Sequence, residues 1–134
     1  MRACVLAAAL LAALPAAAQP ACNPALPGGK QLESARFSLG YRPVPGAVAV
    51  GRHFALELAV CPKTGVQAPE SVSVDAHMPE HRHGMNYKAQ VGAAPGGRYK
   101  AEGLMFHMPG RWEFVFDVRS GGKSDRLTQS IVLE

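Results

Sequence analysis

Hydrophobic and polar residues alternate one by one in several segments of this chain after residue 18. In residues 54–60 every second side chain is apolar and sizeable, and residues 112–118 repeat this pattern from Trp112 onward. A period of two is typical of a strand with one buried face, whereas a helix would show a period near 3.6. The alternation, together with shorter β-favouring runs, predicts seven strands, at residues 36–42, 53–61, 71–77, 87–91, 98–104, 111–118 and 126–133.

Turn-forming residues separate the predicted strands. Proline, glycine and small polar residues gather at residues 43–46, 62–65, 92–97, 109–110 and 120–123, where they favour reversal of the chain. Seven short strands in about 100 residues are typical of an immunoglobulin-like antiparallel β-sandwich, so we expect an all-β domain over residues 35–134. The preceding residues 19–34 are expected to form an extended N-terminal segment. Residues 19–29 hold three prolines and two glycines and should be poorly packed apart from Cys22.

The first 18 residues have the features of a secretory signal peptide. One positive charge, Arg2, precedes an apolar run over residues 5–14, and Pro15 and three alanines follow. The run is too short to span a membrane, and no later stretch is apolar enough to do so. We therefore expect cleavage near Ala18, leaving a periplasmic or secreted mature chain of about 116 residues (134 minus 18) with no transmembrane span. Acylation of Cys22 is the alternative, which the residues before it disfavour.

Charge and motif content argue against several classes of function. The formal net charge of +4 is spread along the chain, and a secreted protein without a basic stripe is not expected to bind nucleic acid. We find no Ser, His and Asp order typical of a hydrolase, no acid–base pair and no cofactor-binding loop. The sequence therefore predicts a protein that is not an enzyme.

Two cysteines, Cys22 and Cys61, remain once the signal peptide is removed. An even number of cysteines in an oxidising compartment predicts a disulfide. The bond would close a loop of about 40 residues and contribute roughly 3–4 kcal/mol in the chain-entropy model. The alternative is that Cys61 supplies a thiolate ligand to copper.

The order of the predicted strands separates these cysteines from the histidines. Consecutive strands of an all-antiparallel sandwich run in opposite directions, so their connections alternate between the two ends of the domain. The first, third and fifth connections share one end and hold, or lead into, all five histidines. Cys61 closes the second strand and Cys22 precedes the first, so both belong to the opposite end. This separation favours the disulfide over a copper thiolate.

Two predicted loops at the histidine end contain four of the five histidines and four of the five methionines. Imidazole and thioether together suit copper, as Cu(I) or Cu(II), whereas zinc has little use for a thioether. In an extended segment His81, His83 and Met85 point the same way, because they are two residues apart. We therefore predict a copper site whose candidate ligands are His81, His83, Met85, His77, Met105 and His107.

Other residues near these loops receive lesser roles. Asp75 and Glu80 are expected to supply an oxygen ligand or to orient an imidazole, and His53 is a weaker candidate ligand. A purely structural interpretation also stands, since Met78 and Met108 each precede a proline and would then plug the end of the core.

Both loops resemble signature segments of the YtkA/FixH-like family. Residues 78–85, Met-Pro-Glu-His-Arg-His-Gly-Met, match its Met-Pro-x-His-x-His-Gly-Met pattern, and residues 106–112 match its Phe-x-Met-Pro-Gly-x-Trp pattern. The resemblance covers roughly residues 50–134. It implies a small extracytoplasmic β-sandwich, of a kind that is sometimes tethered to the membrane and sometimes occurs in systems that handle copper or assemble copper-containing oxidases. This chain differs in having no predicted membrane anchor.

Two functions of different classes follow from the sequence. The first is a copper-binding carrier or chaperone that uses the His/Met loops and meets a copper-handling or oxidase-assembly protein as its partner. The second is a metal-free accessory or protein-interaction module whose polar end docks a partner. Stoichiometric copper uptake by the oxidised mature domain would separate the two.

Overall fold

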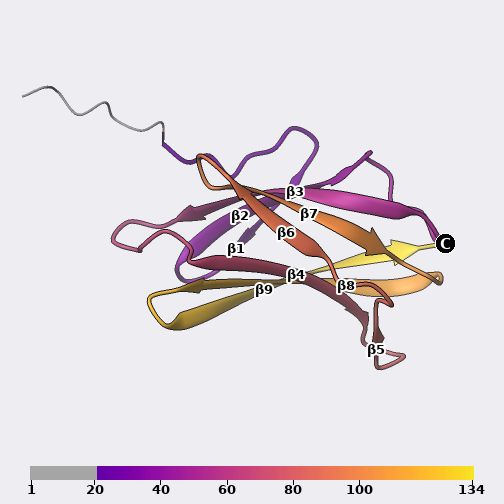
Figure 1. The fold of residues 1–134 in the computed structure, drawn as a ribbon. Coiled ribbons are helices and arrows are strands. Elements are labelled where there is room, and N and C mark those ends of the chain that lie inside the picture. The colour runs from indigo at the N-terminus through magenta and orange to yellow at the C-terminus, as the bar shows by residue number, and fades with distance from the viewer. Residues whose placement is uncertain (1–20) are drawn as a thin grey trace, which may run out of the picture.

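The computed structural model describes residues 21–134 as two packed antiparallel sheets without helices. The expected signal peptide, residues 1–18, lies outside the described residues. The five-stranded sheet has the order β1-β2-β3-β7-β6 and the four-stranded sheet the order β5-β4-β8-β9 (Figure 1). The strands are β1 (Lys30–Glu33), β2 (Phe37–Val44), β3 (His53–Pro62), β4 (Ser71–Met78), β5 (His83–Gly84), β6 (Gln90–Ala94), β7 (Arg98–Met105), β8 (Gly110–Ser120) and β9 (Lys123–Leu133). No helix in the described part of the chain is long and apolar enough to cross a membrane.

The strand order confirms the immunoglobulin-like sandwich. Without β1 and β5, the sheets read β2-β3-β7-β6 and β4-β8-β9, which is the order of the constant-type immunoglobulin domain, with four strands facing three. The expected count of seven strands is wrong, because β1 and β5 are added at the sheet edges. β1 has a largely polar sequence and β5 has two residues, so neither shows alternation. The fourth predicted strand also begins later, at Gln90, because the residues before it cross between the sheets.

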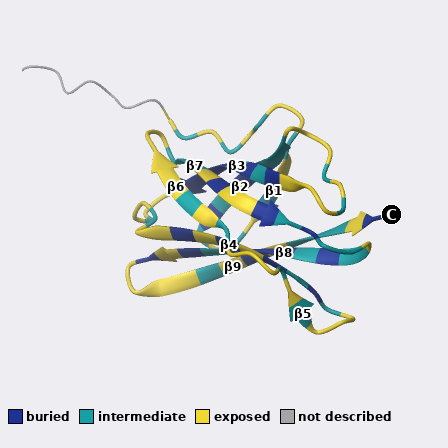
Figure 2. Ribbon diagram, turned by 45° about the vertical axis from the view of Figure 1, so that its right-hand side comes forward, coloured by how far each residue is buried: buried dark blue, intermediate teal, exposed yellow. Residues whose placement is uncertain are grey.

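The core lies between the two sheets and is built from the alternating residues. In β8, Trp112, Phe114, Phe116 and Val118 are all fully buried, and β3 contributes its own alternate apolar residues. Figure 2 shows these buried positions recurring along the strands where the sheets face each other. The predicted assignment of Trp112 and its phenylalanine neighbours to the core is confirmed.

A β-bulge in β7 changes which of its side chains face inward. Phe54 of β3 stands opposite Leu104 and Leu56 stands opposite Ala101, so Ala55 alone faces two residues of β7, Glu102 and Gly103. Gly103 adopts a φ of 82°, a conformation that glycine tolerates at little cost. The extra residue turns Leu104 and Phe106 into the core, where both are fully buried, and leaves Met105 on the outer face.

The N-terminal segment is packed against the outer face of the five-stranded sheet. The predicted disulfide between Cys22 and Cys61 is confirmed, with a Cα–Cα distance of 5.5 Å. Pro24 lies so close to Gly40 of β2 that a Cβ at residue 40 would overlap the Pro24 carbonyl. The Arg42 side chain donates a hydrogen bond to the carbonyl of Pro27 at 3.2 Å. The segment therefore runs along β2, where Gly40 leaves room for the Pro24 backbone.

Candidate metal centre

The two His/Met loops meet at one end of the sandwich, as the alternation of connections predicts. The ring centres of His83, in β5, and His107, between β7 and β8, are 5.2 Å apart. His53 begins β3 at this same end, because it pairs with Met105. Cys61 lies near the other end of β3. Figure 1 shows β5 and the end of β7 at one end of the molecule.

A tight hairpin between β4 and β5 positions His81 and His83. The backbone amide of His81 donates to the carbonyl of Met78 at 3.2 Å, and Arg82 closes the turn with a φ of 53°. His83 pairs with Met78, and because paired residues of neighbouring strands share a face, its ring points toward the end of the core. The rings of His81 and His83 have their centres 5.8 Å apart.

An ion pair fixes this hairpin to the beginning of β8. Nε of Arg111 donates to Oε1 of Glu80 at 2.7 Å. This hydrogen bond holds the pKa of the Glu80 carboxyl below its usual value. Glu80 therefore supports the turn that carries His81. The other carboxylate expected near the ligands, Asp75, accepts a hydrogen bond from the backbone amide of Ala76 at 2.8 Å.

His107 stands against the buried indole of Trp112. The preceding residue, Phe106, stacks on Trp112 with ring centres 4.5 Å apart, and Nε1 of Trp112 donates to the carbonyl of Met108 at 3.0 Å. These contacts fix the loop, and the ring centres of His107 and Trp112 are 5.4 Å apart. Nδ1 of His107 is buried and has no hydrogen-bond partner. The lone pair of an unpaired buried ring nitrogen is a ligand that a metal ion would satisfy.

Four of the six predicted ligands belong to this part of the molecule. We name His81, His83 and His107 the histidine cluster. Met85 donates its backbone amide to the carbonyl of Ala76 at 3.3 Å, and its side chain packs against the core, on the same face of the hairpin as His83. Met85 is thus a nearby thioether at the inner side of the cluster.

The other two predicted ligands lie on outer faces of the sandwich. His77 pairs with Gly84 and alternates with buried residues of β4, so its ring turns away from the core, where Nε2 lies 3.6 Å from Oε1 of Glu113. Met105 stands opposite His53 on the five-stranded sheet. The structure does not bring His77 or Met105 to the histidine cluster.

Two of the ring separations in the cluster are close to the spacing of two imidazoles on one metal ion. Two imidazoles that bind one ion at about 2.0–2.1 Å, with a tetrahedral angle between the bonds, place their ring centres about 5 Å apart. The separations of 5.2 Å and 5.8 Å are close to this value. Nδ1 of His83 lies 3.2 Å from the carbonyl of Gly84, which leaves Nε2 available to a metal. Across residues 21–134, however, no three side chains of His, Cys, Asp or Glu are already arranged around one ion.

Two residues outside the predicted ligand set shape the cluster. Trp112 forms its inner wall, with its ring centre 5.8 Å from that of His83, and Arg111 holds the hairpin through Glu80. One feature of the sequence points to both residues. Arg111 and Trp112 directly follow the Pro109-Gly110 turn, which itself directly follows His107 and Met108.

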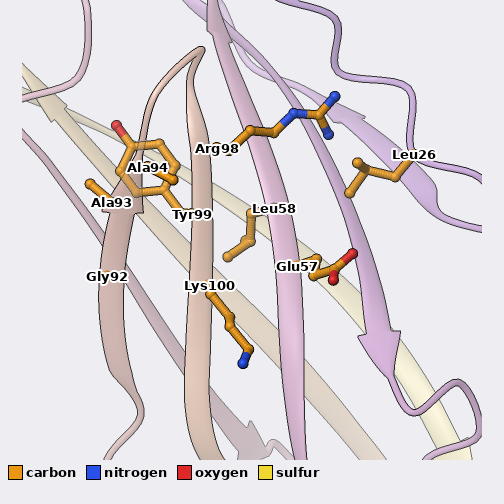
Figure 3. Close-up of a pocket in the computed structure, with 9 residues that line it drawn as sticks. All are labelled: Leu26, Glu57, Leu58, Gly92, Ala93, Ala94, Arg98, Tyr99 and Lys100. Carbon is orange, nitrogen blue, oxygen red and sulfur yellow. The ribbon is translucent and has the colours of Figure 1, made fainter.

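A separate depression of about 410 Å³ lies on the outer face of the five-stranded sheet. Figure 3 shows it between Leu26 of the N-terminal segment and strands β3, β7 and β6, with Glu57, Arg98 and Lys100 around it. Glu57 is engaged by Arg42 at 2.6 Å, and none of the predicted ligands lines the depression. The candidate metal centre is therefore the histidine cluster at the end of the sandwich.

Comparisons with known proteins identify no family for this chain. No family model and no curated protein matches the sequence. The crystal structure of a DUF4426 family protein from Pseudomonas aeruginosa PAO1 superposes with a TM-score of 0.48 and 11% sequence identity, covering 77% of this chain and 94% of that one.

Proposed function

We propose that this protein is an extracytoplasmic copper-binding carrier or chaperone that holds copper through the histidine cluster. The observation that carries the proposal is the position of the His83 ring, 5.2 Å from that of His107 and 5.8 Å from that of His81. His81 is exposed and His83 half-buried, so the His81 side chain has room to turn toward an ion held by the other two rings. The protein would act without catalysis, by binding and releasing the metal.

The chemistry of the surroundings supports copper over zinc. Met85 lies two residues beyond His83 on the same face of the hairpin, and thioethers suit Cu(I), whereas zinc sites use nitrogen, thiolate or carboxylate ligands. The Glu80 carboxylate is already paired with Arg111. The disulfide supports an oxidising, extracytoplasmic location. The resemblance of both loops to the YtkA/FixH-like family agrees with copper handling and with a partner from that chemistry.

A double substitution in the hairpin tests the proposal. His81→Ala/His83→Ala leaves one imidazole and one thioether, so the affinity for the first equivalent of copper should fall at least about a hundredfold, where each tenfold loss is about 1.4 kcal/mol. The measurement is a competition titration of the oxidised domain with a chromophoric copper chelator. Circular dichroism should be unchanged, because neither side chain belongs to the core.

His77→Ala is the matched control for this double substitution. His77 is a histidine of the same segment but faces the outer side of the four-stranded sheet, so this variant should bind the first copper like the parent. If the double variant also binds like the parent, the histidine cluster is not the site. The metal-free interaction module then becomes the better proposal.

A further inference from the structure

We propose a second, independent metal site on the outer face of the five-stranded sheet, in which the imidazole of His53 and the thioether of Met105 bind Cu(I). His53 and Met105 are direct cross-strand partners in β3 and β7. This pairing separates Met105 from the histidine cluster, where its sequence spacing from His107 had suggested a common site. The proposal goes beyond the function proposed above and does not depend on it.

The register and burial of the two strands bring both donors to one face. The next pair inward, Phe54 and Leu104, is buried in the core, so His53 and Met105 both point outward. Directly opposed residues in an antiparallel pair have Cβ atoms about 4.5–5.5 Å apart. A nitrogen and a sulfur that extend from such positions are able to reach a common ion between them.

The β-bulge is the reason that Met105 takes this position. In a regular strand, burial of Ala101 would place every second residue inward, including Gly103 and Met105. The extra residue at Glu102 and Gly103 reverses this order, so that Leu104 is buried and Met105 is half-exposed. The bulge therefore presents a thioether at the surface beside an imidazole.

An aromatic side chain lies against the His53 member of the pair. The ring of Tyr87 meets the ring of His53 edge-on, with centres 5.0 Å apart. Tyr87 precedes β6, and β7 lies between β6 and β3 in the sheet. To contact His53 of β3, the Tyr87 side chain must therefore reach past β7, the strand that ends at Met105. Tyr87 remains 46% exposed and His53 is exposed, so an ion bound there would be open to exchange.

The donor set selects a soft monovalent ion. One imidazole and one thioether satisfy Cu(I), which accepts two ligands, but not zinc, which takes four in structural sites. This site has fewer ligands than the histidine cluster, so it should bind the second equivalent of Cu(I), with lower affinity than the first. A weaker site near the same end of the molecule would suit the uptake or release of copper.

Silver tests the site, because Ag(I) is a soft stand-in for Cu(I) that does not change oxidation state. The oxidised domain, labelled with ¹³C at its methionine methyl groups, is titrated with Ag(I). The Met105 methyl signal, assigned by its loss in Met105→Leu, should shift as the second equivalent is added. In His53→Ala this shift should disappear, whereas in the control Met85→Leu it should persist. An unshifted Met105 signal in the parent, or the same shift in His53→Ala, would overturn the site.

The hairpin variant separates this proposal from the proposed function. In His81→Ala/His83→Ala the Met105 shift should persist while the first, tighter equivalent is lost. If the Met105 shift disappears in that variant, Met105 belongs to the histidine cluster and the second site is wrong. Suppose instead that His81→Ala/His83→Ala leaves the affinity for the first equivalent unchanged, while His53→Ala abolishes the Met105 shift. The second site then stands, and the histidine cluster is not the tighter site.

Discussion

A single carboxylate, Asp125, connects the two sheets at the end opposite the histidines. Ser34 donates its hydroxyl to Asp125 at 2.6 Å, and Nε of Arg36 donates to its other oxygen at 2.6 Å. Asp125 lies in β9, whereas Ser34 and Arg36 lie between β1 and β2, so the contact joins elements of different sheets. These hydrogen bonds hold the pKa of the Asp125 carboxyl below its usual value, and the bond from Ser34 has the larger effect.

Asp125→Asn should reduce the free energy of unfolding by about 1.5–3 kcal/mol at pH 7, the usual contribution of hydrogen bonds to a charged group. A carboxylate whose pKa is lowered by folding stabilises the protein above its unfolded pKa of about 4, and this contribution is lost as pH falls through the folded pKa. The difference between parent and variant should therefore shrink below pH 4 in urea titrations. Asp117→Asn is the control, because its partner Arg126 is 67% exposed, and its effect should be smaller.

At the scale of elements, the bulge in β7 marks the limit of what the sequence predicts. Alternation reveals the main strands, because burial of one face repeats every two residues, and the order of connections brings His83 and His107 together. The same rule fails after Gly103, where one extra residue moves Met105 to the face of His53. The sequence also does not reveal β5, whose pairing with Met78 of β4 decides that His83 points inward.

Gly103→Ala should destabilise the fold by about 1–2 kcal/mol, because a residue with a Cβ is strained at positive φ. Space is not the cause, since the nearest atom to an added Cβ would be the Lys88 carbonyl oxygen at 3.8 Å. Gly92→Ala, on neighbouring β6, is the matched control, because that glycine has no positive φ and open space around it. Equal urea midpoints for the two variants would contradict the importance of the bulge.

At the scale of the whole molecule, the stabilising crosslink and the candidate chemistry occupy opposite ends. The disulfide joins the N-terminal segment to the end of β3, and the histidine cluster lies beyond the other ends of the strands. The core of both sheets separates them. Changes at the disulfide are therefore expected to alter stability without altering the ligands.

Reduction of the disulfide should lower the melting temperature, because the closed loop, with a sequence separation of 39 residues, contributes roughly 3–4 kcal/mol in the chain-entropy model. The same loss is expected in Cys22→Ser/Cys61→Ser, measured by thermal circular dichroism. Below its melting temperature the variant should keep the parent's copper affinity. Loss of copper binding in a folded variant would show that the two ends are coupled.

The placement of the two chain ends has a practical consequence for handling the protein. Residue 21 adjoins the disulfide end, because the next residue is Cys22, whereas Leu133 pairs with Gly110 and brings the C-terminus to the histidine end (Figure 1). A polyhistidine tag added after Glu134 would therefore place six competing imidazoles beside His107. A protein immobilised through an N-terminal tag would instead present its histidines to the solution, accessible to a metal donor or a partner.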